Sequence, residues 1–205
     1  RMPDNEDTLN LIKMCGVPLA APSANLSGSP SPTTAQHVYA DMNGRIPLII
    51  DGGECKNGVE STVICFTDGG TGIKVLRPGV ITAEMLSRFA KTETDKNVFA
   101  KPDENEKVIS PGVKYKHYSP RADITIIETD SDGKLAEFLN SKNDGGTYGV
   151  IFGGEKGIEV PTISYGSTAQ EQAHNLFAVL RKTDELGAKR AYVRCPEKTG
   201  VGTAV

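Results

Sequence analysis

Tryptophan is absent from the chain, cysteines are few and no long hydrophobic run occurs. The 205 residues include four cysteines, which are scattered, with no Cys-x-x-Cys pair and no histidine at ligand spacing. A disulfide framework and a zinc site are therefore not expected, and a reducing, cytoplasmic setting is the simplest prediction. No apolar run approaches the ~20 residues that a membrane-spanning helix needs, so we expect no membrane partner.

The balance of charge is nearly even. The formal net charge is −3, which excludes a global attraction for nucleic acid or anionic membranes, so any anion must be bound by a local arrangement. The sequence contains no Gly-x-x-x-x-Gly-Lys-Ser/Thr phosphate loop, no metal-binding histidine pair and no Gly-x-Ser-x-Gly motif. The 22 glycines and 12 prolines are clustered in a few places and favour a loop-rich α/β protein over a helical bundle.

The second half of the chain alternates between strand and helix patterns. The predicted strands are 124–127, 148–152 and 190–194, with a short extended piece at 161–165. The predicted helices are 134–142 and 167–186. This alternation is typical of a parallel sheet with crossover helices.

The first half mixes the two patterns less regularly. Helices are predicted at 6–15, 32–42 and 82–90. Strands are predicted at 18–22, 46–51, 59–66 and 73–76, the last two as a hairpin. Residues 91–106 carry few apolar side chains and are expected to form a linker.

Between the strand at 18–22 and the helix at 32–42, the apolar run ends in short hydroxyl and amide side chains, among them Ser23 and Asn25. Ser31 is predicted to cap the helix, with the following proline at its first position. Small polar groups at a strand end that faces a helix N-terminus suggest a phosphate or carboxylate site. The alternative is an ordinary strand–turn–helix connection whose serines only cap and turn.

Two further short motifs place polar groups on predicted strands. Period-two alternation puts Glu60 and Ser61 on opposite faces of one strand, where Ser61 is either a ligand-binding group or a satisfied sheet hydroxyl. Arg77-Pro78-Gly79 places a permanent cation at a strand end beside a tight turn. Guanidinium is the preferred partner of phosphate, but a surface salt bridge explains the arginine equally well.

Residues 110–120, Ser-Pro-Gly-Val-Lys-Tyr-Lys-His-Tyr-Ser-Pro, are predicted to form an extended strap. The prolines and the glycine exclude a helix. Lysines are interleaved with the rings of Tyr115, His117 and Tyr118, and no acidic residue occurs between positions 106 and 123. Such a segment can cover a nucleotide, with rings over the base and cations near the phosphates; the alternatives are a solvated linker or a patch that binds RNA non-specifically.

Four motifs and the strap, in this order, resemble one family. Pro-Leu-Ala-Ala-Pro-Ser-Ala-Asn-x-Ser-Gly at 18–28, Ser-Pro-Thr at 31–33, Glu-Ser-Thr-Val at 60–63 and Arg-Pro-Gly at 77–79 resemble the YrdC-like domain of L-threonylcarbamoyl-adenylate synthases. The strap resembles the interdomain linker of the long form of these enzymes. The pattern after residue 123 is similar to their Rossmann-like C-terminal extension.

The resemblance implies an α/β fold in three parts. Residues 1–91 would be the C-terminal half of a YrdC-like twisted mixed-sheet domain, 92–122 an extended interdomain linker, and 123–205 a small Rossmann-like domain with a parallel sheet. The family's first domain begins well upstream of the segment that matches Arg1, so the chain would be truncated at its N-terminus. We expect such a half-sheet with exposed edges to be poorly stable, and the chain alone to be inactive.

The resemblance also implies a reaction. Threonine, bicarbonate and ATP would give L-threonylcarbamoyl-AMP and pyrophosphate, and the product would pass to the machinery that transfers threonylcarbamoyl to adenosine in tRNA. Threonine carbamate carries its own nucleophilic oxygen, so the protein mainly positions two anions and no catalytic residue is expected. Mg²⁺ would be held mainly by the phosphates. Direct binding of tRNA stays open.

The site residues are implied by the same resemblance, position by position. ATP would be contacted by Ser23, Ser31, Arg77 and Tyr118. Threonine would be held by Arg1, the backbone around Ala21, and Ser61. Asn25 and His117 would lie next to the substrates.

Two other functions fit some of these features. A related carbamoyl transferase could use the same domain with other substrates, as in hydrogenase maturation, but the strap and the C-terminal domain argue against it. A non-catalytic RNA-binding module would need a concave basic face, and the net charge of −3 counts against it. Steep salt-dependent RNA binding without any threonine-dependent nucleotide effect would favour this module.

Overall fold

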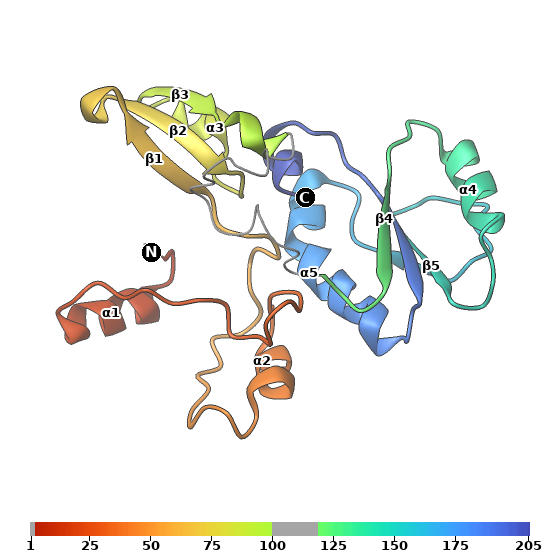
Figure 1. Cartoon of the computed structure of the whole chain (residues 1–205), viewed down its shortest axis with the longest axis horizontal. Coiled ribbons are helices and arrows are strands. Elements are labelled where there is room, and N and C mark those ends of the chain that lie inside the picture. Colours follow the sequence, from red (N-terminus) through yellow and green to blue (C-terminus); the bar gives the residue numbers. More distant parts are fainter. Residues whose placement is uncertain (1–2, 100–118) are drawn as a thin grey trace, which may run out of the picture.

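Two β-sheets, each with its own helices, make up the described residues 3–99 and 119–205 of the computed structural model (Figure 1). The first sheet is mixed and lies within residues 63–94, and the second is parallel and lies within residues 123–194. The long helix α5 (Ala169–Glu185) lies between the second sheet and the N-terminal segments. The predicted α/β fold, a mixed sheet followed by a parallel one, is therefore confirmed.

The first sheet is a hairpin with one added strand. β1 (Val63–Thr67) and β2 (Gly72–Arg77) pair antiparallel, as the sequence predicts, and β3 (Lys91–Thr94) pairs parallel with β2. The central strand β2 buries most of its side chains, including Ile73 and Val75. Arg77, the last residue of this strand, is therefore attached to a backbone that the buried strand holds in place.

The strand β3 corrects the prediction of a linker over 91–106. Its residues are polar, but Thr92 and Thr94 are β-branched and half-buried, and the open edge of β2 supplies partners for their backbone. The parallel connection between β2 and β3 runs through α3 (Ala83–Leu86). This helix is capped by Thr82, as predicted, but is shorter than predicted.

Two short helices precede the first sheet. α1 (Glu6–Cys15) has the predicted range, begins where the Asn5 side chain accepts the Thr8 N–H, and ends at Gly16 with a φ of 67°. α2 (Ala35–Met42) begins later than predicted.

The prediction that Ser31 caps α2 is wrong. Thr34 caps this helix instead, and its hydroxyl accepts the His37 N–H at 3.2 Å. The Ser31 hydroxyl donates to Glu60, a residue of a different segment, at 2.9 Å. The Ser31 side chain, which the local pattern assigned to the helix cap, therefore makes a long-range contact instead.

The strands predicted at 18–22 and 46–51 do not form. Both segments are irregular and mostly exposed, with exposed fractions of 70% for Leu48 and 78% for Ile50. A strand needs a hydrogen-bonded neighbour, and no segment among residues 3–99 and 119–205 pairs with either of them.

The second sheet has the strand order β4–β7–β5–β6, with all neighbours parallel. Its strands are β4 (Asp123–Ile127), β5 (Thr147–Ile151), β6 (Thr162–Ser164) and β7 (Arg190–Arg194). All four lie where the sequence predicts them. The last strand in the chain thus lies inside the sheet.

Helices cover both faces of the second sheet. α4 (Asp132–Asn140) packs Leu135 and Leu139 against Ile151 on one face. On the other face, α5 packs Val179 against Val150. No helix in the described part of the chain combines the length and the apolar character that crossing a membrane requires.

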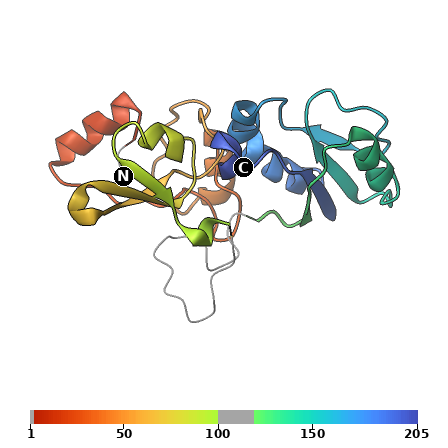
Figure 2. The same ribbon diagram turned by 90° about the horizontal axis from the view of Figure 1, so that it is seen from above.

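The segment that leads into β1 lies directly on α5 (Figure 1, Figure 2). The Gly58 N–H donates to the Ala173 carbonyl at 2.8 Å, and the Gly58 carbonyl accepts the Phe177 N–H at 3.1 Å. A Cβ on Gly58 would lie 2.1 Å from the His174 carbonyl oxygen, so only glycine permits this approach. This contact joins the first half of the chain to the second domain.

We expect Gly58→Ala to destabilise the chain and Gly52→Ala to leave its stability almost unchanged. The added methyl group at 58 must displace the α5 backbone or break both hydrogen bonds, at a cost of about 1–3 kcal/mol. At Gly52, in the same connecting segment, a Cβ meets nothing within 4 Å and φ is not positive. Thermal unfolding of both variants measures the difference. Equal melting temperatures would contradict the close contact at Gly58.

Candidate functional site

Three predicted site residues meet around one carboxylate, that of Glu60. The Ser31 hydroxyl donates to Glu60 Oε1 at 2.9 Å, and Arg77 Nη2 lies 3.3 Å from Glu60 Oε2. Arg77 also binds Ser61: Nε and Nη2 donate to the carbonyl at 3.0 and 2.9 Å, and Nη2 reaches the hydroxyl at 3.2 Å. These four residues form one polar cluster, called the Glu60 cluster below.

Backbone packing fixes the Glu60 cluster. Arg77 is the last residue of β2, and the turn that follows it lies on the segment that carries Glu60. A Cβ on Gly79 would lie 2.4 Å from the Thr62 nitrogen, so this turn needs its glycine. The side chains of Arg77 and Glu60 are only 14% and 17% exposed, which makes their attraction stronger than that of an ion pair in open solvent.

Sequence reasoning overlooks Glu60. Period-two alternation places it on the opposite face from Ser61, but β1 begins only at Val63. Residues 60 and 61 precede the strand in irregular backbone, so both can turn toward Arg77. The signal lies in the Glu-Ser-Thr-Val motif itself, where a carboxylate directly precedes the predicted ligand-binding hydroxyl.

The polar loop before Ser31 is held together by Asn25. Its Nδ2 donates to the carbonyls of Leu26 and Ser29, both at 2.9 Å. Its Oδ1 is buried, and no donor in the described part of the chain reaches it. The carbonyl of Gly28 accepts the N–H of Ser119 at 3.0 Å, so residue 119 lies beside this loop.

The structure does not join every predicted residue to the Glu60 cluster. Ser23 is half-buried and Ala21 is exposed, and within residues 3–99 and 119–205 no hydrogen bond or ion pair links either one to the cluster. The other three, Arg1, His117 and Tyr118, lie outside the described residues.

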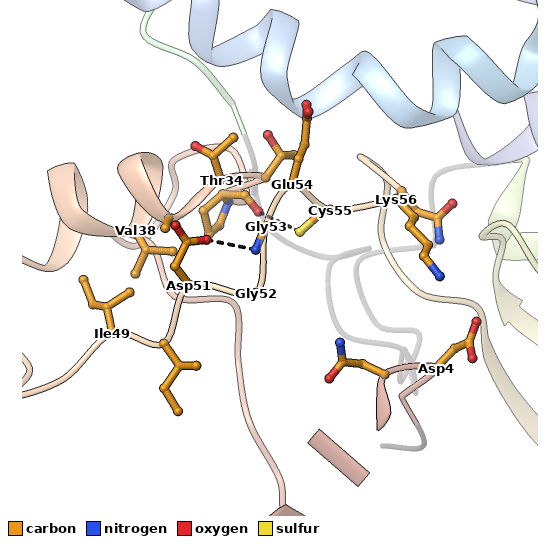
Figure 3. Close-up of a pocket in the computed structure, with 16 residues that line it drawn as sticks. Asp4, Thr34, Val38, Ile49, Asp51, Gly52, Gly53, Glu54, Cys55 and Lys56 are labelled. Carbon is orange, nitrogen blue, oxygen red and sulfur yellow. Dashed lines mark hydrogen bonds between the residues drawn. The ribbon is translucent and has the colours of Figure 1, made fainter. Parts of the chain in front are cut away.

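An open pocket of about 540 Å³ lies at the start of α2 (Figure 3). Val38 and Ile49 line one side of it, and Asp4 and Lys56 lie on the other (Figure 3). Among the described lining residues, Asp4, Asp51 and Glu54 carry carboxylates, whereas Lys56 carries the one ammonium group. The helix start predicted as an anion site thus opens into an acidic pocket, which a polyphosphate would enter only together with a cation.

The groups at this pocket and in the Glu60 cluster are suited to binding and orienting ligands. Burial, and after it the charge of Glu54, raises the pKa of the Cys55 thiol, so this thiol stays protonated at neutral pH. No three His, Cys, Asp or Glu side chains in the described ranges come together as metal ligands. The hydroxyls of Ser31 and Ser61 and the guanidinium of Arg77 are the polar groups that the Glu60 cluster brings together.

The ring of His37 on α2 is held by the residues just before its own helix. Its Nδ1 accepts the Thr33 N–H at 3.2 Å. Burial, and then the charge of Arg181 on α5, lowers the pKa of His37, while three nearby carboxylates oppose this shift. The fold therefore favours the neutral ring of His37.

Two models of known protein families together match almost the whole chain. A family model of the Sua5, YciO and YrdC proteins, described as telomere recombination, matches residues 1–79. A second model, described as the C-terminal domain of threonylcarbamoyl-AMP synthase, matches residues 81–205, more than half of the chain. The chain belongs to the threonylcarbamoyl-AMP synthase family. The family resemblance of the sequence motifs is thereby confirmed.

Curated threonylcarbamoyl-AMP synthases match this chain over its full length. The protein from Pyrococcus abyssi is 39% identical over 211 residues, and the protein from Bacillus subtilis is 41% identical over 213 residues. Each alignment covers 100% of this chain and 60% of the relative. The chain therefore spans about 60% of the length of these two synthases.

Solved structures of P. abyssi Sua5 share the fold. A crystal structure of that protein complexed with L-threonine has a TM-score of 0.82 and 38% identity, and the match covers 100% of this chain and 60% of that one. A variant of the same protein, with an adjacent His and Tyr both replaced by alanine, matches with a TM-score of 0.86 and 37% identity, over 100% and 59% of the two chains. Both sheets of this chain are thus arranged as in a threonylcarbamoyl-AMP synthase.

We expect His37 to make the stability of this chain depend on pH below about 6.5. Free histidine titrates near 6.5, and the fold lowers the pKa of His37 below that value. Between the two pKa values only the unfolded chain binds the proton. The stabilisation present above about pH 6.5 is therefore lost as the pH falls through the folded-state pKa.

Melting temperatures between about pH 5 and 8 test this for the parent and for His37→Gln. The glutamine can accept a hydrogen bond but does not titrate, so its curve should be flatter. Parallel curves for the two proteins would show that His37 is not responsible.

Proposed function

We propose that this chain takes part in the synthesis of L-threonylcarbamoyl-AMP from L-threonine, bicarbonate and ATP, with release of pyrophosphate. One observation carries the proposal: Ser31, Ser61 and Arg77, which the family motifs assign to ATP and threonine, lie together around Glu60. Membership of the synthase family supports it. The curated relatives bear the name of this activity, and one solved relative is complexed with L-threonine.

The reaction needs orientation more than an activated side chain. The threonine amine and bicarbonate combine to a carbamate with loss of water. A carbamate oxygen then attacks the α-phosphorus of ATP, the bond from that phosphorus to the bridging oxygen breaks, and pyrophosphate leaves. Holding two anions in line and neutralising charge at the phosphate supplies most of the acceleration in such a displacement.

The Glu60 cluster fits this task. Glu60 and Ser61 hold Nε and Nη2 of Arg77, and the Nη1 edge of the guanidinium would face a phosphate of ATP. Ser31 and Ser23 would bind the nucleotide on the same side. Ser61, Arg1 and the backbone around Ala21 would hold threonine. The buried Oδ1 of Asn25, which no donor among residues 3–99 and 119–205 reaches, is able to accept a hydrogen bond from a substrate.

The strap would close over the bound nucleotide through Tyr118 and His117. Two findings support this placement. Ser119, the next residue after this pair, donates to Gly28 in the polar loop. An adjacent His and Tyr were replaced in a solved P. abyssi relative, and an adjacent pair of this type occurs here at 117–118.

Further parts of the proposal concern cofactor, partners and domains. Mg²⁺ would enter with ATP and would be held mainly by the phosphates. The product would pass, in the cytoplasm, to the machinery that modifies tRNA to threonylcarbamoyladenosine. Because β3 belongs to the first sheet, we place the end of the YrdC-like part after Thr94 and not at residue 91, with the linker following it up to 122 and the Rossmann-like part at 123–205.

Pyrophosphate release is the test of this function. The Glu60 cluster forms within the described residues, so in place of the inactive chain that the resemblance implies we expect release from ATP that requires both threonine and bicarbonate. The full-length P. abyssi relative is the positive control. Release by this chain that needs both co-substrates supports the proposal. No release by this chain, while the relative is active in the same assay, refutes it for the chain on its own.

We expect Arg77→Met to weaken ATP binding by about 10- to 100-fold, because a charge-assisted hydrogen bond to phosphate is lost. Lys74→Met is the matched control, since Lys74 lies on the same strand and pairs with Glu93 at 2.8 Å, away from the Glu60 cluster. Titration of ATP into both variants measures the affinities. Similar affinities for the two would remove Arg77 from the nucleotide site.

A further inference from the structure

Helix α5 presents one arginine of the second domain to the first. Arg181 Nη2 donates to Asp41 Oδ2 at 2.6 Å and to the Pro30 carbonyl at 2.7 Å. Its Nη1 reaches Asp41 Oδ1 at 3.3 Å, and its Nε reaches the Ser31 carbonyl at 3.3 Å. The side chains of Arg181 and Asp41 are 11% and 12% exposed, so this ion pair is nearly buried.

These contacts clamp the backbone at Ser31. Two consecutive carbonyls, those of Pro30 and Ser31, accept from one planar guanidinium, which restrains the peptide plane between them. Asp41, in the last turn of α2, is held by the same guanidinium and accepts the Leu26 N–H at 3.3 Å. Arg181 therefore ties together the polar loop, the residues before α2 and the end of α2.

Asp41 carries its charge in this arrangement. Burial alone would raise the pKa of this carboxyl group, but the hydrogen bond and the charge of Arg181, together with the Leu26 N–H, hold the pKa below its usual value. Without the guanidinium, a nearly buried carboxylate and two carbonyl oxygens would lose their donor. The contact thus differs from an exposed ion pair, which contributes little.

The clamped residue is itself a member of the Glu60 cluster. The Ser31 hydroxyl donates to Glu60, and the other oxygen of Glu60 pairs with Arg77. A rotation of the Ser31 peptide would move this hydroxyl and leave the Glu60–Arg77 pair without one of its supports.

We propose that Arg181 is a positioning residue, through which the C-terminal domain holds Ser31 and the Glu60 cluster in the geometry that binds ATP. The inference rests on the proposed function for the identity of the ligand. It assigns the C-terminal domain a part in the nucleotide site, from a helix that contributes no residue to the cluster itself.

Steady-state kinetics of pyrophosphate release test the proposal with three variants. Arg181→Met should raise the KM for ATP by about tenfold or more, and the KM for threonine by less, because the clamp acts on Ser31. Arg181→Lys keeps the charge but loses the planar fork, so it should recover only part of the ATP affinity. Lys182→Met, the next residue on α5, removes an exposed charge that pairs with Glu185 and should change neither KM by more than about twofold.

A double variant separates positioning from charge balance. Arg181→Met combined with Asp41→Asn leaves no unpaired buried charge, so it guards against misfolding of the single variant. The KM for ATP should stay raised in the double variant. Its return to the parent value would overturn the proposal, because Arg181 would then only compensate Asp41.

Amide hydrogen exchange gives a readout that needs no ATP. Peptides that cover 26–33 and 58–62 should exchange faster in Arg181→Met than in Lys182→Met. If exchange rises but the parent itself neither binds nor turns over ATP, the proposed function fails and the clamp stands. If the parent is active and Arg181→Met leaves either the exchange or the KM for ATP unchanged, the positioning role is overturned.

Discussion

The close approach of the segment before β1 to helix α5 is the constraint on which the site depends. Gly58 lies against the helix backbone with no room for a Cβ, so the helix sets the path of this segment. Two residues later the same segment carries Glu60, which Ser31 and Arg77 reach from other elements. Residues far apart in sequence thus come together because one short stretch of backbone is fixed.

Sequence patterns predicted the second domain well and the first domain poorly, for one physical reason. A pattern shows that a segment can pair, but not that a partner lies beside it. The apolar run at 46–51 has the composition of a buried strand and is irregular and exposed, while the polar residues of β3 form a strand because β2 offers an open edge. In the second sheet every predicted strand has a predicted neighbour, so pattern and structure agree there.

The candidate site was likewise predictable from the sequence only in part. The hydroxyls and the guanidinium could be chosen from the sequence because their chemistry suits anions. Their arrangement could not, since the Ser31 hydroxyl fits a helix cap and a distant carboxylate equally well, and only tertiary packing decides between them. Nothing in the local pattern indicates that Arg181 reaches the carbonyls of Pro30 and Ser31, because this contact also depends on tertiary packing.

The place of β7 in the second sheet has a consequence for the order of assembly. This strand is the last in the chain, yet it pairs with both β4 and β5. Until it has been made, β4 has no partner and the face that α5 covers is incomplete. Because a nascent chain emerges from its N-terminus, the loop at Ser31 is synthesised well before β7. The hydrogen bonds from Arg181 to this loop become stable only after β7 has paired and α5 has packed on the sheet. The Glu60 cluster therefore reaches its final geometry only after β7 has joined the second sheet.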